Sequence, residues 1–171
     1  RSQRLLVNDE YQEVFVATAG ETSFFNITTN DLYGNRKTVG GEEFIVSVGL
    51  TIEGSTIDLT DGTYIGQYLV FAGGYYPLRV TVNGMVVEQP APPFIVSSTA
   101  FPLVILAADV YADECEAFGL GLKNAEVGVP STFSVLAHDR YGNRKILGGD
   151  GAGFSASLVG FESTDANPVD N

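Results

Sequence analysis

The sequence predicts an all-β fold made of two tandem antiparallel β-sandwiches, of which the second is incomplete. Short runs of β-branched and aromatic residues alternate with polar residues at a period of two, the pattern of half-buried strands. Glycine and asparagine turn signals separate these runs, and no stretch shows helical periodicity with caps. One long segment also occurs twice, at a spacing typical of a whole small domain.

The duplicated segment begins Asp31-Leu32-Tyr33-Gly34-Asn35 in the first copy and Asp139-Arg140-Tyr141-Gly142-Asn143 in the second. The aspartate can accept hydrogen bonds from backbone N–H groups just after it, and Gly-Asn tolerates the positive φ of tight turns. A Gly-Gly pair follows in each copy and predicts a bulge or kink before the next strand. The structural turn positions are therefore Asp31, Gly34, Asn35, Gly40 and Gly41, repeated 108 residues later as Asp139, Gly142, Asn143, Gly148 and Gly149.

The strands of the first copy follow in order from alternation and turn signals. They are predicted at residues 11–18, 23–29, 43–50, 56–59, 63–70, 76–82 and 94–96. Asn83-Gly84 predicts a type I′ hairpin that leads into residues 85–87, because this turn needs positive φ at both central positions. Short strands at this spacing indicate an antiparallel sandwich.

The predicted domain boundary lies between residues 98 and 99. Residues 1–98 form a complete first domain, and residues 99–171 form the front part of a second, with strands at 115–122, 129–136 and 154–159. The apolar stretch 97–106 is expected to be a packed junction or the first strand of the second copy. Half a sandwich cannot bury both faces of its sheet. We therefore expect the polypeptide to continue or a partner to supply the missing strands.

These motifs together resemble a filamin-type immunoglobulin-like repeat. The resemblance rests on Asp-x-x-Gly-Asn, the Gly-Gly pair and the strand opening at Phe44, and on Asp61-Gly62-Thr63-Tyr64 and Pro92-Pro93-Phe94-Ile95-Val96. It covers nearly all of the first copy and the front of the second. It implies sandwiches that act as rigid spacers and protein-docking modules. Cys115 resembles a cysteine often seen at this position and is expected to be a small buried residue, the alternative being a redox or cross-linking thiol.

Composition limits the classes of partner. The net charge of −12, with 9 Lys and Arg residues, argues against binding to a nucleic-acid backbone or to anionic lipid. No apolar run is long enough for a membrane span, so we expect no direct membrane insertion. The single cysteine excludes an internal disulfide framework, and no signal peptide is recognised at the N-terminus.

No catalytic constellation is present, and we expect the protein not to be an enzyme. His138 is the only histidine, which excludes a metal site or an acid–base pair built on several histidines. The acidic residues at 113–116 have no calcium-loop spacing, and the glycine-rich turns lack a phosphate-loop pattern. No cofactor or metal is predicted.

Two kinds of surface site remain. Asn26-Ile27-Thr28 is an N-glycosylation sequon whose Asn26 lies on the predicted solvent face, although such triplets also arise by chance. The filamin resemblance implies that a partner strand can add beside the third strand. The candidates for this docking are Ile45, Ser47, Thr56, Ile57, Asp58 and Leu59. The alternative is a short, protected edge. Tyr64, Tyr68 and Tyr76 are interpreted as core residues rather than as a carbohydrate-binding stripe.

The sequence thus indicates a structural and interaction segment of a multi-repeat protein, whose partners are other chains or neighbouring repeats bound by strand addition or end-to-end packing. The acidity and the sequon favour an extracellular or cell-surface filament or adhesion protein. The filamin resemblance and the lone thiol favour a cytoplasmic or ciliary scaffold. An accessory domain of an enzyme is a third class, and no actin-binding domain is visible in this chain.

Overall fold

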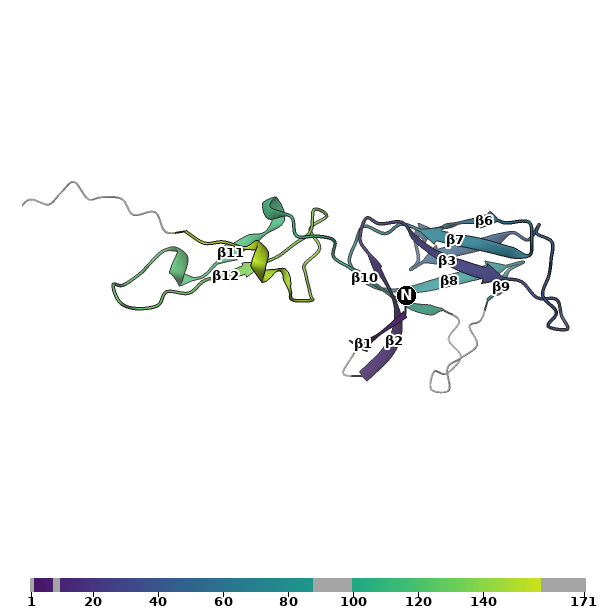
Figure 1. The fold of residues 1–171 in the computed structure, drawn as a ribbon, viewed down its shortest axis with the longest axis horizontal. Coiled ribbons are helices and arrows are strands. Elements are labelled where there is room, and N and C mark those ends of the chain that lie inside the picture. The colour runs from purple at the N-terminus through teal and green to yellow at the C-terminus, as the bar shows by residue number, and fades with distance from the viewer. Residues whose placement is uncertain (1, 8–9, 88–99, 158–171) are drawn as a thin grey trace, which may run out of the picture.

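The computed structural model describes residues 2–7, 10–87 and 100–157, and in these ranges the chain is all-β (Figure 1). The helical elements within them are three short 3₁₀ turns, so none is long and apolar enough to cross a membrane. The strands form a first unit of two sheets and a second unit with one small sheet (Figure 1).

The larger sheet of the first unit has seven strands. In spatial order its strands are β1 (Ser2–Val7), β2 (Glu10–Thr18), β10 (Phe101–Leu106), β8 (Gly74–Val82), β4 (Phe44–Val48) and β5 (Ile52–Glu53), with β9 (Met85–Val86) also paired to β8. β10 runs parallel to β2, and the other pairs are antiparallel. Asn83 and Gly84 both have positive φ (51° and 76°), as the β8–β9 hairpin requires.

The smaller sheet has the order β3 (Ser23–Thr28), β7 (Thr63–Tyr68), β6 (Ser55–Asp58). It packs on the larger sheet because alternate side chains of both sheets are apolar and meet in one core. Tyr64 and Tyr68 are buried in this core, and the Tyr64 ring lies edge-on to Phe44 with centroids 4.7 Å apart. Every buried residue of the core cluster belongs to the first unit, which therefore has a hydrophobic core of its own.

The last strand of the first unit differs from the prediction. β10 pairs with both β8 and β2, and its Leu103 and Ile105 are buried in the core. Residues 101–106 are therefore neither a junction nor the start of the second copy, and the expected boundary at residue 98 is wrong. The reason is that Leu103, Val104 and Ile105 are buried in succession, so both faces of β10 are covered and its sequence does not alternate. The predicted strand at 94–96 lies outside the described residues.

The second unit is sparse. Its elements are η1 (Ala112–Glu114), β11 (Glu116–Phe118), η2 (Leu120–Leu122), β12 (Ser134–Leu136) and η3 (Asp150–Gly153). β11 and β12 pair antiparallel. The strand predicted at 154–159 is not formed at 154–157, the part of it that the structure describes. The apolar side chains of this unit stay largely exposed because no second sheet covers them in the described part of the chain.

Candidate functional site

The first copy of the duplicated turn is held by its own side chains. Asp31 Oδ1 accepts hydrogen bonds from the backbone N–H groups of Tyr33 (2.9 Å) and Asn35 (2.8 Å). Asn35 Nδ2 donates to Asp31 Oδ2 at 2.9 Å, and Gly34 takes a φ of +83°. These bonds, led by the one from the Asn35 side chain, lower the pKa of Asp31. The turn is thus complete without a neighbour.

The second copy has the same internal geometry. Asp139 Oδ1 accepts from the N–H groups of Tyr141 and Asn143, both at 2.9 Å. Asn143 Nδ2 donates to Asp139 Oδ2 at 2.9 Å, and Gly142 has a φ of +78°. The sequence Asp-x-Tyr-Gly-Asn therefore specifies one local structure in both places.

The Gly-Gly pairs follow each turn, beside an ion pair that is also duplicated. Lys37 pairs with Glu42, and Lys145 lies 3.8 Å from Asp150, 108 residues further on. A side chain at Gly40 would overlap the carboxylate of Asp58.

The glycine that follows Gly40 in the first pair is bound to a nearby carboxylate. The N–H of Gly41 donates to Asp58 Oδ2 at 2.7 Å. Asp58, expected as a docking residue, is therefore engaged with the turn. In the second copy Gly148 and Gly149 have no such neighbour.

The second turn, unlike the first, docks on the first unit. The carbonyl of Phe71 accepts a hydrogen bond from Asn143 Nδ2, and the N–H of Gly73 donates to Asn143 Oδ1, both at 2.7 Å. The N–H of Ala108 donates to Asp139 Oδ2 at 2.8 Å. Asp139 has 0% of its surface exposed, although carboxylates are seldom buried this completely without partners. The turn is thus a connector between the two units.

An aromatic contact and a lysine complete this junction. The Tyr141 ring packs edge-on against Phe71 with centroids 5.2 Å apart, and it fills the space that a side chain at Gly20 would need. Lys145 Nζ donates to the carbonyl of Ala108 at 3.0 Å. The junction therefore combines backbone and amide hydrogen bonds, one buried carboxylate, one lysine ammonium and one edge-on aromatic contact.

The carboxyl group of Asp139 is held ionised. Burial alone would raise its pKa, but the hydrogen bonds from the Asn143 side chain and from three backbone N–H groups act in the opposite direction and lower it. The negative charge of the Asp139 carboxylate is thus stabilised by the hydrogen bonds that it accepts.

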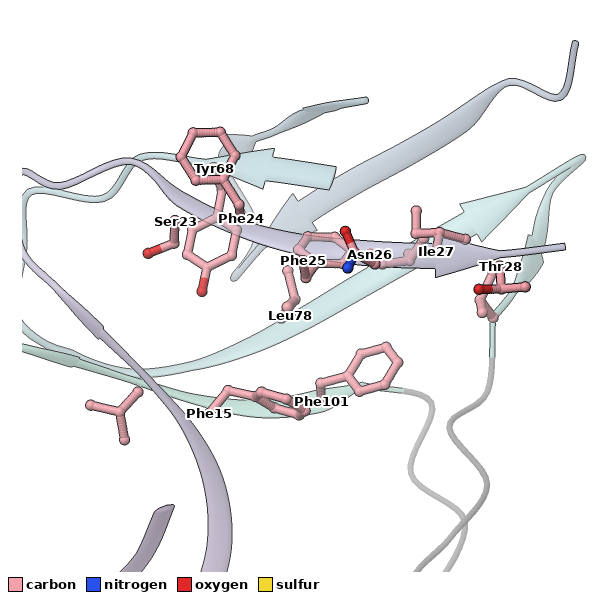
Figure 2. Close-up of a pocket in the computed structure, with 13 residues that line it drawn as sticks. Phe15, Ser23, Phe24, Phe25, Asn26, Ile27, Thr28, Tyr68, Leu78 and Phe101 are labelled. Carbon is pink, nitrogen blue, oxygen red and sulfur yellow. The ribbon is translucent and has the colours of Figure 1, made fainter. Parts of the chain in front are cut away.

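A groove in the first unit is the second feature of interest (Figure 2). A cavity of about 540 Å³ lies beside β3, between the two sheets. Its apolar lining includes the aromatic side chains of Phe15, Phe25, Tyr68 and Phe101. β3 is one of the two edge strands of the smaller sheet, so the groove lies next to an edge. The groove was not predicted from the sequence, because alternation shows which side chains point inward but not which strand edges lack a neighbour.

The second copy shows what can pair with such an edge. β12 corresponds, 108 residues further on, to residues 26–28 of β3. β12 pairs with β11, whereas β3 pairs only with β7 in the described part of the chain. The edge that β11 covers in the second unit therefore has no paired strand in the first among residues 2–7, 10–87 and 100–157.

The predicted docking residues lie on β4 and β6, two neighbouring strands that belong to different sheets. Ile45 is 61% exposed and lies on the outer face of the larger sheet, opposite to its buried neighbours Phe44 and Val46. Ser47 pairs with Glu53 of β5, so the edge of β4 is partly covered. The remaining candidates lie on or just after β6, in the other sheet, and are Thr56, Ile57, Asp58 and Leu59.

The modification and thiol candidates are placed as follows. Asn26 is exposed and lies at the groove. Cys115 is half-buried, and its Sγ lies 3.3 Å from the carbonyl of Tyr111. Within the described ranges, no three His, Cys, Asp or Glu side chains are grouped as metal ligands.

No family model matches the chain. Among solved structures, it is similar to InvD of Yersinia pseudotuberculosis, with 15% identity over 71% of this chain and 37% of that chain and a TM-score of 0.44. It is also similar to domains 5–6 of the S-layer protein SbsC, with 18% identity over 77% of this chain and 61% of that chain and a TM-score of 0.40. The chain thus spans less than two thirds of each. These values describe a partial likeness of the backbone.

Proposed function

We propose that this chain is a non-enzymatic segment of a multi-repeat structural protein, in which filamin-type immunoglobulin-like sandwiches serve as rigid spacers and protein-docking modules. The observation that carries the proposal is the docked turn. Asn143 bonds to Phe71 and Gly73 of the first unit and to the fully buried Asp139 of its own turn, and this supports a fixed orientation of one unit on the other. A free tether would leave these groups in water.

The connection between the units is also short. β10 ends at Leu106, and the N–H of Ala108 is already bonded to Asp139. Two residues further on, Val110 forms a β-bridge with Asp139. The chain therefore passes from one unit to the next without a flexible linker, as a spacer requires.

Backbone relaxation by NMR on the intact chain tests the spacer function. We expect both units to tumble with one correlation time. Asn143→Ala removes two hydrogen bonds across the junction, worth about 1–3 kcal/mol together, and should give the second unit faster motion. Asn35→Ala removes the matching side chain from the first turn and should leave the coupled tumbling intact. Independent tumbling of the unaltered chain would rule out the spacer function.

For the docking function, we propose that the partner is an extended strand that adds antiparallel to β3 and covers the groove. The edge of β3, which no other described strand pairs, offers backbone hydrogen bonds, and the apolar groove can take alternate side chains of the added strand. The antiparallel pairing of β11 with β12, the counterpart of residues 26–28 in β3, is an example of such an added strand. The edge of β4, implied by the filamin resemblance, is the alternative site, and its coverage by β5 counts against it.

A peptide of residues 116–122, which carries the β11 sequence, is the probe for strand addition. We expect it to shift the amide signals of residues 26–28 in the NMR spectrum of the chain. Val87→Asp places a charge in the groove and should weaken binding, whereas the matched change Ile45→Asp should not. Loss of binding in the Ile45 variant alone would instead assign the site to the edge of β4.

For the compartment, we propose an extracellular or cell-surface location, with a cytoplasmic or ciliary scaffold as the alternative. The exposed position of Asn26 within its sequon supports the former, because a glycan has room there. The intact mass of native material before and after N-glycosidase treatment decides this point. An unmodified Asn26 would count against the surface location.

A further inference from the structure

We infer that the exposed turn at residues 31–35 is itself a docking surface, and that its occupant is the loop end of a further sandwich placed ahead of it in the array. This inference rests on the proposed repeat function. It assigns to the first turn the role that the second turn already performs within the chain.

The first turn presents every group that the second turn uses. Asn143 contacts the first unit through Oδ1 and Nδ2, and Asp139 Oδ2 accepts from the N–H of Ala108 just after β10. Asn35 and Asp31 hold the same atoms in the same internal hydrogen bonds. The first turn is thus preorganised for the same contacts, and docking would require no change in its backbone.

In the described part of the chain, the side chain of Tyr33 makes no hydrogen bond or ring contact within its own repeat. Tyr33 is 86% exposed, whereas Tyr141 is 41% exposed because it packs on Phe71 and over Gly20. The hydrogen bonds that close the turn involve only the backbone N–H of Tyr33. The proposed occupant would cover the Tyr33 ring as Phe71 covers the Tyr141 ring in the second copy.

The chemistry of the occupant follows from what Tyr141 and Asn143 contact. It must offer a carbonyl and an N–H two residues apart, an aromatic ring, and a glycine that leaves room for a ring. The loop end of the first unit carries these groups at Phe71, Gly73 and Gly20. That end is already occupied by the second unit, so a further sandwich of the same build is required.

A linked neighbour fits better than a separate molecule. The net charge of −12 makes separate copies repel one another, and the direct contacts of the junction are too few to overcome this alone. Covalent linkage supplies a high effective concentration without new contacts. The occupant is therefore a repeat that precedes residue 31 in the same polypeptide.

A fusion protein tests this inference. Residues 1–108 are placed directly ahead of residue 1 of the full chain, so Ala108 of the added unit precedes Asp31 by 31 residues, as Ala108 precedes Asp139. The added unit contains the whole core cluster, and circular dichroism checks that it is folded. All variants carry Cys115→Ser, and a short bifunctional thiol reagent traps cysteine pairs.

Three cysteine pairs are compared. The control pair, Phe71→Cys with Tyr141→Cys in the unfused chain, reports the junction already seen. The test pair combines Phe71→Cys in the added unit with Tyr33→Cys in the unit that follows. The reference pair replaces Tyr33→Cys by Leu50→Cys, at another exposed position.

We expect the test pair to react within about threefold of the control pair and Asn35→Ala to slow it about tenfold, the effect of losing one or two hydrogen bonds. A test pair no faster than the reference pair overturns the inference while leaving the proposed spacer function intact. Cross-links formed only between separate molecules also overturn it. Failure of the control pair would instead remove the rigid junction, and with it the proposed function.

Discussion

The two copies of the Asp-x-Tyr-Gly-Asn turn fold alike but are placed differently. Each is closed by the same set of hydrogen bonds between its aspartate and its asparagine. Asp139 nevertheless lies in the interior of the molecule, while Asp31 lies at the surface. The local sequence therefore sets the shape of the turn, and the neighbouring loop end decides whether that shape joins two units.

The largest difference is expected for the aspartates. Asp139→Ala leaves the N–H groups of Ala108, Tyr141 and Asn143 without their buried acceptor, which should destabilise the junction by about 2–4 kcal/mol. Asp31→Ala exposes its donors to water and should cost much less. Native-state hydrogen exchange at Ala108 and Gly73 measures the difference. Equal effects of the two substitutions would show that burial of Asp139 is not what fixes the junction.

A smaller difference is expected for the tyrosines. Tyr141→Ala removes the edge-on contact with Phe71 and should weaken the junction by about 0.5–1.5 kcal/mol beyond the lost apolar burial. Tyr33→Ala should leave the free energy of unfolding of this chain unchanged. Chemical denaturation of both variants, followed beside the exchange of the Gly73 amide, checks this. A destabilising Tyr33→Ala would mean that its ring already has a role in its own unit.

The smallest difference appears only in acid. The pKa of Asp139 is lowered on folding, so its contribution is complete above the ordinary value of 3.8 and is lost as the pH falls through the folded pKa. The amide shifts of Ala108 and Gly73 should stay constant from pH 7 to pH 5 and change below about pH 3.8. Asp31 titrates in the same direction but should not move these signals. Asp139→Asn should abolish the transition, and its persistence would assign the acid step to another group.

Some strands of the first unit could be predicted from the sequence, whereas the place of β10 and the burial of the second turn could not. The strands of the first unit that alternate in polarity, such as β3 and β7, were predicted within one or two residues because one face of each is in contact with water. β10 was assigned to the wrong unit because its buried residues are adjacent in sequence. The turns at residues 31–35 and 139–143 share the sequence Asp-x-Tyr-Gly-Asn, so their sequences do not indicate that only the second is buried. That difference arises from Gly20 and Phe71, which are far from Tyr141 in sequence.

Gly20 has a consequence for how an assembly of such units would bend. The position takes a φ of +77°, and any side chain there would displace the tyrosine ring that occupies its place. The angle between consecutive modules thus depends on the missing side chain at Gly20 as well as on the contacts of the junction. A single Gly20→Ala exchange should displace the Tyr141 ring and so tilt each module against the next.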